Sequence, residues 1–262
     1  MTTLMGIAFV IFCAAISVMW PGAGGFGFFN VPSAICVFGG VIGAAVASYP
    51  PAKLKRLIKA VGTAFYSKDI DFIAEVDKMV DIANIARREG LVGLDALAGS
   101  VGNPFLRKGI LLICECSNAE TVQNIMETDM TVTRERHGAN QAMLLQMAVF
   151  APAFGLLGTL AGIIKLLGAM ESAAAFGYGV SFTSGVAFAL IAALYGLLPA
   201  YAVFTPLAKK LKSHSDDEYL QKEIQLEGLL SVMNGVHPLI IRESLGSFLS
   251  RRLFIKTDRR GE

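Results

Sequence analysis

The side chains that could carry a charge or move a proton are confined almost entirely to two blocks of this chain, residues 53–137 and 209–262. Outside these blocks only Lys165 and Glu171 are charged. Three long tracts contain no Asp, Glu, His, Lys or Arg: residues 1–52, 138–164 and 172–208. Chemistry that needs an acid or a base must therefore occur in the charged blocks, or use a group that another molecule supplies.

No motif in the chain predicts an enzyme. Residues 22–27 (GAGGFG) fit the dinucleotide pattern GxGxxG, but no strand precedes them and they lie in a short link between apolar tracts. The sequence contains no GxxxxGK[ST], GxSxG or HExxH motif, and its three histidines are scattered through the charged blocks. We therefore expect neither an enzymatic activity nor a cofactor.

The cysteines do not predict a metal site. Cys13 and Cys36 lie in apolar tracts, and Cys114 and Cys116 lie in the first charged block. A structural zinc site usually needs four ligands, often spaced as CxxC, and this chain offers a single Cys-Glu-Cys. We expect ordinary buried thiols and no bound metal.

A proline and a hydroxyl mark a third tract, residues 142–167, as a candidate path for an ion. Pro152 frees a backbone carbonyl, and Thr159 places a hydroxyl about two turns further along. Such a break is tolerated in a membrane where water or a neighbouring group satisfies the backbone, so a wet path and a plain kink both remain open. Ion paths generally use an intramembrane carboxylate, a histidine or a ring of carbonyls. If this chain conducts ions, we expect a partner to supply a buried Asp or Glu.

The elements that carry these residues are predicted to be membrane-spanning helices. The chain is 54% hydrophobic and 17% charged, against about 25% charged for soluble domains. Four tracts approach or exceed the roughly 20 residues that cross a bilayer: about 4–20, 32–48, 142–167 and 180–206. The first lacks the positive flank of a signal peptide, so we interpret it as a retained span. The second should end at Tyr49-Pro50-Pro51.

Charge asymmetry predicts the orientation. Of the 23 Lys and Arg, all but Lys165 fall in the two charged blocks. The positive-inside rule then places both blocks and both termini in the cytoplasm, with Lys165 reaching to the opposite headgroups. The predicted fold is all-α, a polytopic membrane protein with four transmembrane helices and a helical cytoplasmic domain. From the N-terminus, the predicted parts are spans one and two (residues 1–50), a cytoplasmic helical domain (51–140), spans three and four (141–208) and a cytoplasmic helical tail (209–262).

Small residues recur on the last two spans. Gly155, Gly158 and Gly162 lie on the third. The fourth has two runs of small residues spaced by four, Gly185-Ala189-Ala193 and Ala192-Gly196-Ala200. Small residues let apolar helices approach closely. This pattern predicts packing inside one subunit, and it also suggests contacts with other subunits or with the helix of a partner.

Four segments resemble the MotA and PomA family of flagellar stator subunits, in the same order and over nearly the whole chain. They are residues 87–95 (RREGLVGLD), 151–162 (APAFGLLGTLAG), 195–211 (YGLLPAYAVFTPLAKKL) and 228–238 (GLLSVMNGVHP). The resemblance implies a homopentamer in the bacterial inner membrane, around two copies of a single-span MotB-type partner. The partner's membrane aspartate would carry the ion, and the pentamer would push on the rotor protein FliG.

The resemblance also implies roles for individual residues. Pro152 and Pro206 would couple ion passage to movement, and Thr159, Ala193 and Tyr201 would accompany them along the ion path. In the first charged block, Arg87, Arg88 and Asp95 would face the rotor, with Asp95 standing where the family commonly has Glu. No nucleic acid is expected as a partner.

Alternatives remain open for the coupling ion and for the branch of the family. Sodium-driven relatives tend to carry hydroxyls at the positions of Thr159 and Ala193, and this chain keeps only the first, so we expect protons and retain a sodium-driven PomA-type stator as the alternative. A TolQ- or ExbB-type energiser of outer-membrane processes shares the last two spans but usually has three spans in all. A purely structural membrane scaffold would explain the small residues but not the prolines beside a hydroxyl.

Overall fold

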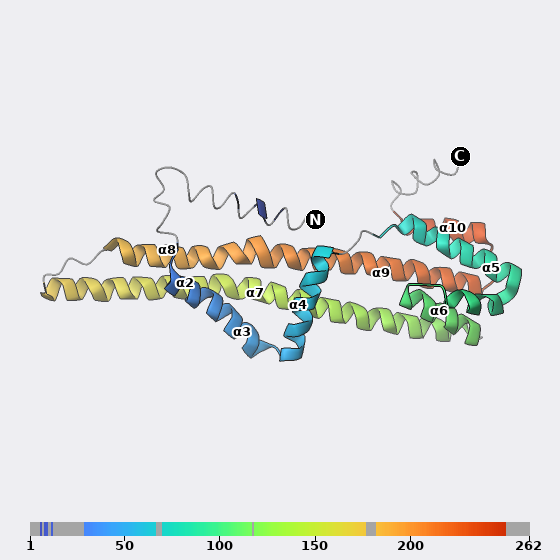
Figure 1. The fold of residues 1–262 in the computed structure, drawn as a ribbon, viewed down its shortest axis with the longest axis horizontal. Coiled ribbons are helices and arrows are strands. Elements are labelled where there is room, and N and C mark those ends of the chain that lie inside the picture. The colour runs from blue at the N-terminus through green and yellow to red at the C-terminus, as the bar shows by residue number, and fades with distance from the viewer. Residues whose placement is uncertain are drawn as a thin grey trace. The chain divides into compact units, whose positions relative to one another are not determined.

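The computed structural model describes residues 29–66, 70–116, 118–176 and 182–249, together with Gly6, Ala8, Phe9 and Phe12. All regular structure in this part of the chain is helical, which confirms the predicted all-α class (Figure 1). Its elements are α2 (Val31–Ala34), the π-helical turn η2 (Ile35–Gly39), α3 (Gly40–Ser48), α4 (Pro51–Tyr66), α5 (Phe72–Ala98), α6 (Pro104–Glu115), α7 (Ala119–Phe176), α8 (Phe182–Pro199), the π-helical turn η3 (Ala200–Phe204), α9 (Thr205–Met233) and α10 (Pro238–Gly246).

Three helical stretches are long and apolar enough to cross a membrane: Val31–Ser48, Ala119–Glu171 and Gly185–Met233. They contain most of the predicted second and third spans and the greater part of the predicted fourth. The predicted first span, residues 4–20, lies outside the described residues apart from four isolated positions.

Local signals set the ends of these helices. Asn30 caps α2, because its side-chain Oδ1 accepts a hydrogen bond from the Ser33 amide at 3.1 Å. Helix α3 ends where expected, at Tyr49, whose backbone is extended (φ −131°) because a proline follows. Pro51 then starts α4, since a proline is tolerated in a first helical turn.

The chain divides into two compact units. The first unit comprises residues 1–67 and 137–212, and the second comprises residues 68–136 and 213–262. The long helices α7 and α9 each contribute residues to both units. Both units are therefore assembled from segments that are far apart in the sequence.

The second unit is a helical cluster in which α5 packs on α6 and on α10. Its fully buried side chains come from these helices and from parts of α7 and α9, and include Met79, Leu94, Ile110, Met126, Leu229 and Ile241. Helix α6 has a side-chain cap at its start: Asn103 accepts hydrogen bonds from the amides of Phe105 (2.9 Å) and Leu106 (3.3 Å), and Pro104 occupies the first turn.

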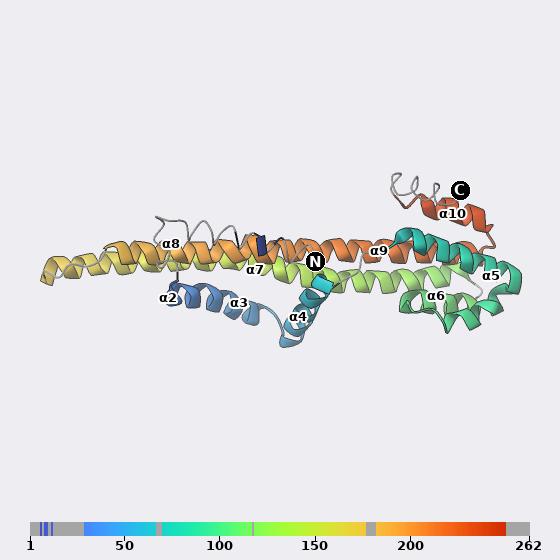
Figure 2. The ribbon, with the colours of Figure 1, turned by 45° about the horizontal axis from the view of Figure 1, so that its top comes forward.

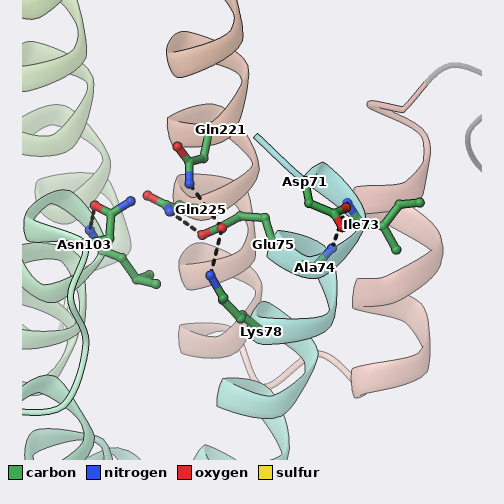
Figure 3. A network of polar contacts seen from close by, with 9 residues as sticks. Asp71, Ile73, Ala74, Glu75, Lys78, Asn103, Gln221 and Gln225 are labelled. Atoms are coloured by element: carbon green, nitrogen blue, oxygen red, sulfur yellow. Dashed lines mark hydrogen bonds and ion pairs between the residues drawn. The ribbon is translucent and has the colours of Figure 1, made fainter. Parts of the chain in front are cut away.

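A carboxylate lies inside this cluster (Figure 3). Glu75 on α5 is 3% exposed, and its oxygens accept hydrogen bonds from two glutamines of α9, Gln225 and Gln221. Lys78 adds an ion pair at 3.3 Å. A buried charge is tolerated when it is paired and hydrogen-bonded, so this network ties α5 to α9 at one register.

The first unit has two smaller apolar clusters. In one, Val41 of α3 packs with Ala151 of α7 and Ala200 of η3. In the other, Leu57 of α4 packs with residues of α7 and α9, namely Met143, Leu144, Leu207 and Ala208. The spans and α4 are thus held together at a few well-buried positions.

Candidate functional site

Helices α7 and α8 lie side by side in both ribbon views, and their small residues form the seam between them (Figures 1 and 2). A Cβ added at Gly196 would lie 2.6 Å from the Ala151 carbonyl oxygen and 3.2 Å from the Cα of Pro152. A Cβ added at Gly155 would lie 3.0 Å from the Ala192 carbonyl oxygen. The two backbones approach closely because neither glycine carries a side chain.

The seam confirms the prediction that small residues pack inside one subunit. Gly158 and Gly162 also face α8 within the same chain, where added Cβ atoms would meet Ala192 at 2.7 Å and Phe188 at 2.7 Å. The faces that carry these four glycines are therefore covered inside the subunit. Large apolar side chains remain exposed on α7 and α8, for example Leu156, Leu157, Leu160, Leu190 and Leu197.

Thr159 links the two helices. Its Oγ1 lies 2.9 Å from the Gly155 carbonyl oxygen on its own helix and 3.1 Å from the Ala189 carbonyl oxygen on α8. A hydroxyl has one proton to donate and two lone pairs, so Thr159 donates to one of these carbonyls and keeps acceptor capacity. Of the other predicted pathway residues, Pro152 and Ala193 adjoin the same seam, where added Cβ atoms on Gly196 and Gly155 would approach them.

The remaining two predicted pathway residues lie near η3. Tyr201 is 67% exposed and therefore does not share the α7–α8 seam. Pro206 lies in the first turn of α9 and is half-buried. The π-helical turn just before it is supported by Thr205, whose hydroxyl donates to the Ala200 carbonyl at 2.8 Å. Single π-helical turns occur frequently at functional sites.

Sequence reasoning missed the residues that attach α2 to α8. The fully buried Ser33 donates its hydroxyl proton to the Phe188 carbonyl at 3.3 Å. The Asn30 amide donates to the Tyr195 hydroxyl at 3.4 Å, and the Tyr195 ring lies 6.2 Å from that of Phe38. Nothing in the local sequence marks these pairs, because the partners are more than 150 residues apart.

The three predicted rotor-facing residues are exposed on α5. Arg87 and Arg88 precede Gly90, whose φ of +73° breaks the regular helix, and Asp95 follows the break. Glycine adopts this conformation without the steric cost that other residues meet. Neither Arg87 nor Asp95 forms an ion pair with another described residue, so both charges face solvent in the isolated chain.

Cys114 lies near this surface but is not poised to react. Burial raises the pKa of the Cys114 thiol, and the carboxylates of Asp95 and Glu115 raise it further. A raised pKa lowers the thiolate fraction at neutral pH, and the thiolate is the reactive form. Among the described residues, no three His, Cys, Asp or Glu side chains gather as a metal site would require.

The arrangement can therefore support an ion path but cannot carry a proton by itself. The α7–α8 seam offers backbone carbonyls, a proline and the Thr159 hydroxyl, and the tracts that build it carry no acid or base apart from Lys165 and Glu171 toward the end of α7. Lys165 is exposed. An ion relay at this seam needs a titratable group from another chain.

Comparisons with known proteins agree with this arrangement. A model of the MotA/TolQ/ExbB proton channel family matches residues 98–224. Motility protein A of Bacillus subtilis (strain 168) is 29% identical over 262 residues, covering 100% of this chain and 95% of that protein. Chemotaxis protein PomA of Vibrio alginolyticus is 30% identical over 246 residues, covering 94% and 92%. The structure of the flagellar MotAB stator complex from Bacillus subtilis matches with a TM-score of 0.87 at 26% identity, covering 98% of this chain and 99% of that chain.

Proposed function

The chain belongs to the MotA/TolQ/ExbB proton channel family, and from this premise we propose that it turns ion flow into torque by moving around a MotB-type partner. It is a flagellar stator ion channel subunit, a kind of function that is not enzymatic. The observation that carries the torque proposal is the α7–α8 seam, which has carbonyls and a hydroxyl for an ion but no proton carrier of its own.

The assembly we propose supplies the missing carrier. A single-span partner brings an intramembrane aspartate to the seam near Thr159, Pro152 and Ala193, and five copies of this chain surround two copies of the partner. Four spans in the bacterial inner membrane then leave both termini and the second unit in the cytoplasm and α4 on the cytoplasmic side of the membrane, as the distribution of Lys and Arg favours.

Torque leaves the complex through the second unit. We place the rotor contact at Arg87, Arg88 and Asp95, because these charges are exposed beside the break at Gly90. Charge pairs across an interface steer encounter and orientation more than they add affinity. A charged surface of this kind therefore suits a contact with FliG that must form and release repeatedly.

The function and its ion are tested together in cells that lack this gene. We expect such cells to build flagella but not to swim, and plasmid-borne expression of the chain to restore swimming. A protonophore should stop the restored swimming, whereas replacing external sodium by potassium should leave the speed unchanged. Speed that follows sodium and resists the protonophore would overturn the proton assignment in favour of a PomA-type stator. Flagellated, fully motile deletion cells with envelope or iron-uptake defects would instead favour a TolQ- or ExbB-type energiser.

Replacing Pro152 by leucine distinguishes a torque-generating channel from a scaffold. Leucine restores the amide that proline lacks, so the Ala148 carbonyl would regain its helical partner and would no longer be free beside the seam. We expect the complex to assemble in wild-type amount while swimming in soft agar is lost. Pro104→Leu is the matched control, because Pro104 is exposed in the first turn of α6, where proline is not required. Normal swimming with Pro152→Leu would favour the scaffold.

A further inference from the structure

Helix α4 separates its residues into a basic face and an apolar face. At 3.6 residues per turn, Lys53, Lys55, Arg56 and Lys59 fall on one side of the helix, and all four are exposed. Residues 51–66 contain no Asp or Glu. None of the four forms an ion pair with a described residue, so their positive charge is uncompensated within this part of the chain.

The opposite face attaches α4 to the spans. Leu57 is 5% exposed and packs with Met143 of α7 and with Leu207 of α9, and Val61 is partly buried against the same cluster. Ile58, at the edge between the two faces, is 74% exposed. Helix α4 therefore packs against α7 and α9 through one face only, while the large apolar side chain of Ile58 stays exposed beside the basic residues.

The direction of α4 fits a membrane surface. Both ribbon views show α4 running at a steep angle to α7 within the first unit, whereas α3 leads into it from a span through a single sharp bend (Figures 1 and 2). If α7 crosses the bilayer, a helix that lies across it where it leaves the membrane lies along the interface. Amphipathic helices with a basic polar face bind there, with the apolar edge at the boundary of the acyl chains.

The charge around α4 is reinforced by α9. Leu207 and Ala208, which pack against Leu57, are followed directly by Lys209, Lys210 and Lys212. Glu171, near the far end of α7, is the only acidic residue among residues 1–67 and 137–212. Seven basic residues and no acid therefore surround this end of the first unit. Clusters of four to eight Lys and Arg beside a transmembrane helix favour anionic lipids.

We propose that α4 is a lipid-binding helix whose basic face holds the headgroups of anionic phospholipids, with Ile58 inserted at the acyl boundary. The phosphate groups complement Lys53, Lys55, Arg56 and Lys59, and the packing of Leu57 fixes the helix against the spans. The inference rests on the proposed membrane placement of the spans and is independent of the ion and of torque.

The test uses the full chain purified with its partner in detergent. Phosphatidylglycerol or phosphatidylcholine is titrated in, and the bound lipids are counted by native mass spectrometry. We expect phosphatidylglycerol to bind in preference, and K55Q/K59Q to lower its affinity roughly 25-fold, about fivefold per charge removed. K55R/K59R should bind as the wild type does. R107Q/K108Q removes the same charge from exposed positions on α6 in the second unit and should also leave binding unchanged.

A second measurement localises the contact without removing any charge. Ile58→Trp, in a Trp20→Phe background, places a fluorophore at the exposed edge of α4. We expect brominated phosphatidylglycerol to quench it more strongly than brominated phosphatidylcholine, and raised salt to reduce the difference. Equal quenching by both lipids, equal binding of both lipids, or equal loss of binding in R107Q/K108Q would overturn the proposal. Swimming is not a readout here, so a wrong stator assignment would leave these results unaffected.

Discussion

Replacing Gly196 by alanine is expected to disrupt the α7–α8 seam and to abolish swimming. The new Cβ would lie 2.6 Å from the Ala151 carbonyl oxygen and 2.9 Å from the Gly155 Cα. Both atoms belong to the backbone, so they cannot move aside as the end of a flexible side chain would. Overpacking typically costs about 1–3 kcal/mol, and this contact should fall at the upper end of that range. The measurements are the yield of monodisperse stator complex, its melting temperature and swimming in soft agar.

Gly62→Ala is the matched control for this substitution. Gly62 is exposed on α4 in the same unit, and a Cβ added there meets nothing within 4 Å. Alanine also favours a helix over glycine by roughly 1 kcal/mol, so the control should be as stable as the wild type or more stable. A Gly196→Ala complex with unchanged yield and melting temperature would contradict the close packing described for α7 and α8.

Replacing Gln225 by leucine is expected to loosen the second unit. Gln225 is fully buried and donates to Glu75, whose Oε1 would be left without that donor in a site that is 3% exposed. An unpaired buried acceptor costs about 1–3 kcal/mol, and more when it is charged. Gln225 Oε1 has no partner among the described residues, so its removal offsets part of this cost. We expect a lower melting temperature of the complex and faster hydrogen exchange in α5 and α9.

Two further variants separate the loss of a hydrogen bond from a general loss of packing. Gln221→Leu removes the other glutamine donor, one turn earlier on α9, from a half-buried position, and should have a smaller effect. Glu75→Leu/Gln225→Leu replaces both partners by apolar groups and should be more stable than Gln225→Leu alone, because no buried charge is left unpaired. A double variant that is less stable than Gln225→Leu would show that Glu75 does not need Gln225.

The functional consequence of this network follows from where it lies. Glu75 is on α5, the helix that also carries Arg87 and Asp95, and Gln225 is on α9, the helix whose first turn contains Pro206. If the rotor contact is made at Arg87 and Asp95, force on α5 reaches α9 through these hydrogen bonds and the apolar contacts around Met79. A loosened network would therefore weaken torque even with the ion path intact.

Much of the candidate site could be predicted because membranes constrain single residues strongly. Because a charge inside a membrane span is costly, spans appear in the sequence as long tracts without ionisable residues. Three of the four predicted spans coincide with described helices. Helix ends are equally local: Tyr49-Pro50-Pro51 marked the end of α3. The same local pattern predicts that any proton carrier comes from another chain.

Contacts between distant segments could not be predicted, because no local pattern records them. The glycines at positions 155 and 196 predicted close packing but not which helix they pack against. Only the folded chain showed that they face each other rather than another subunit. Thr159 with Ala189, and Glu75 with Gln225, are 30 and 150 residues apart. The sequence by itself determined which segments avoid water and which carry charge, since transfer to lipid acts on each residue separately. The tertiary structure alone decided which faces meet, since packing and hydrogen bonding act on pairs.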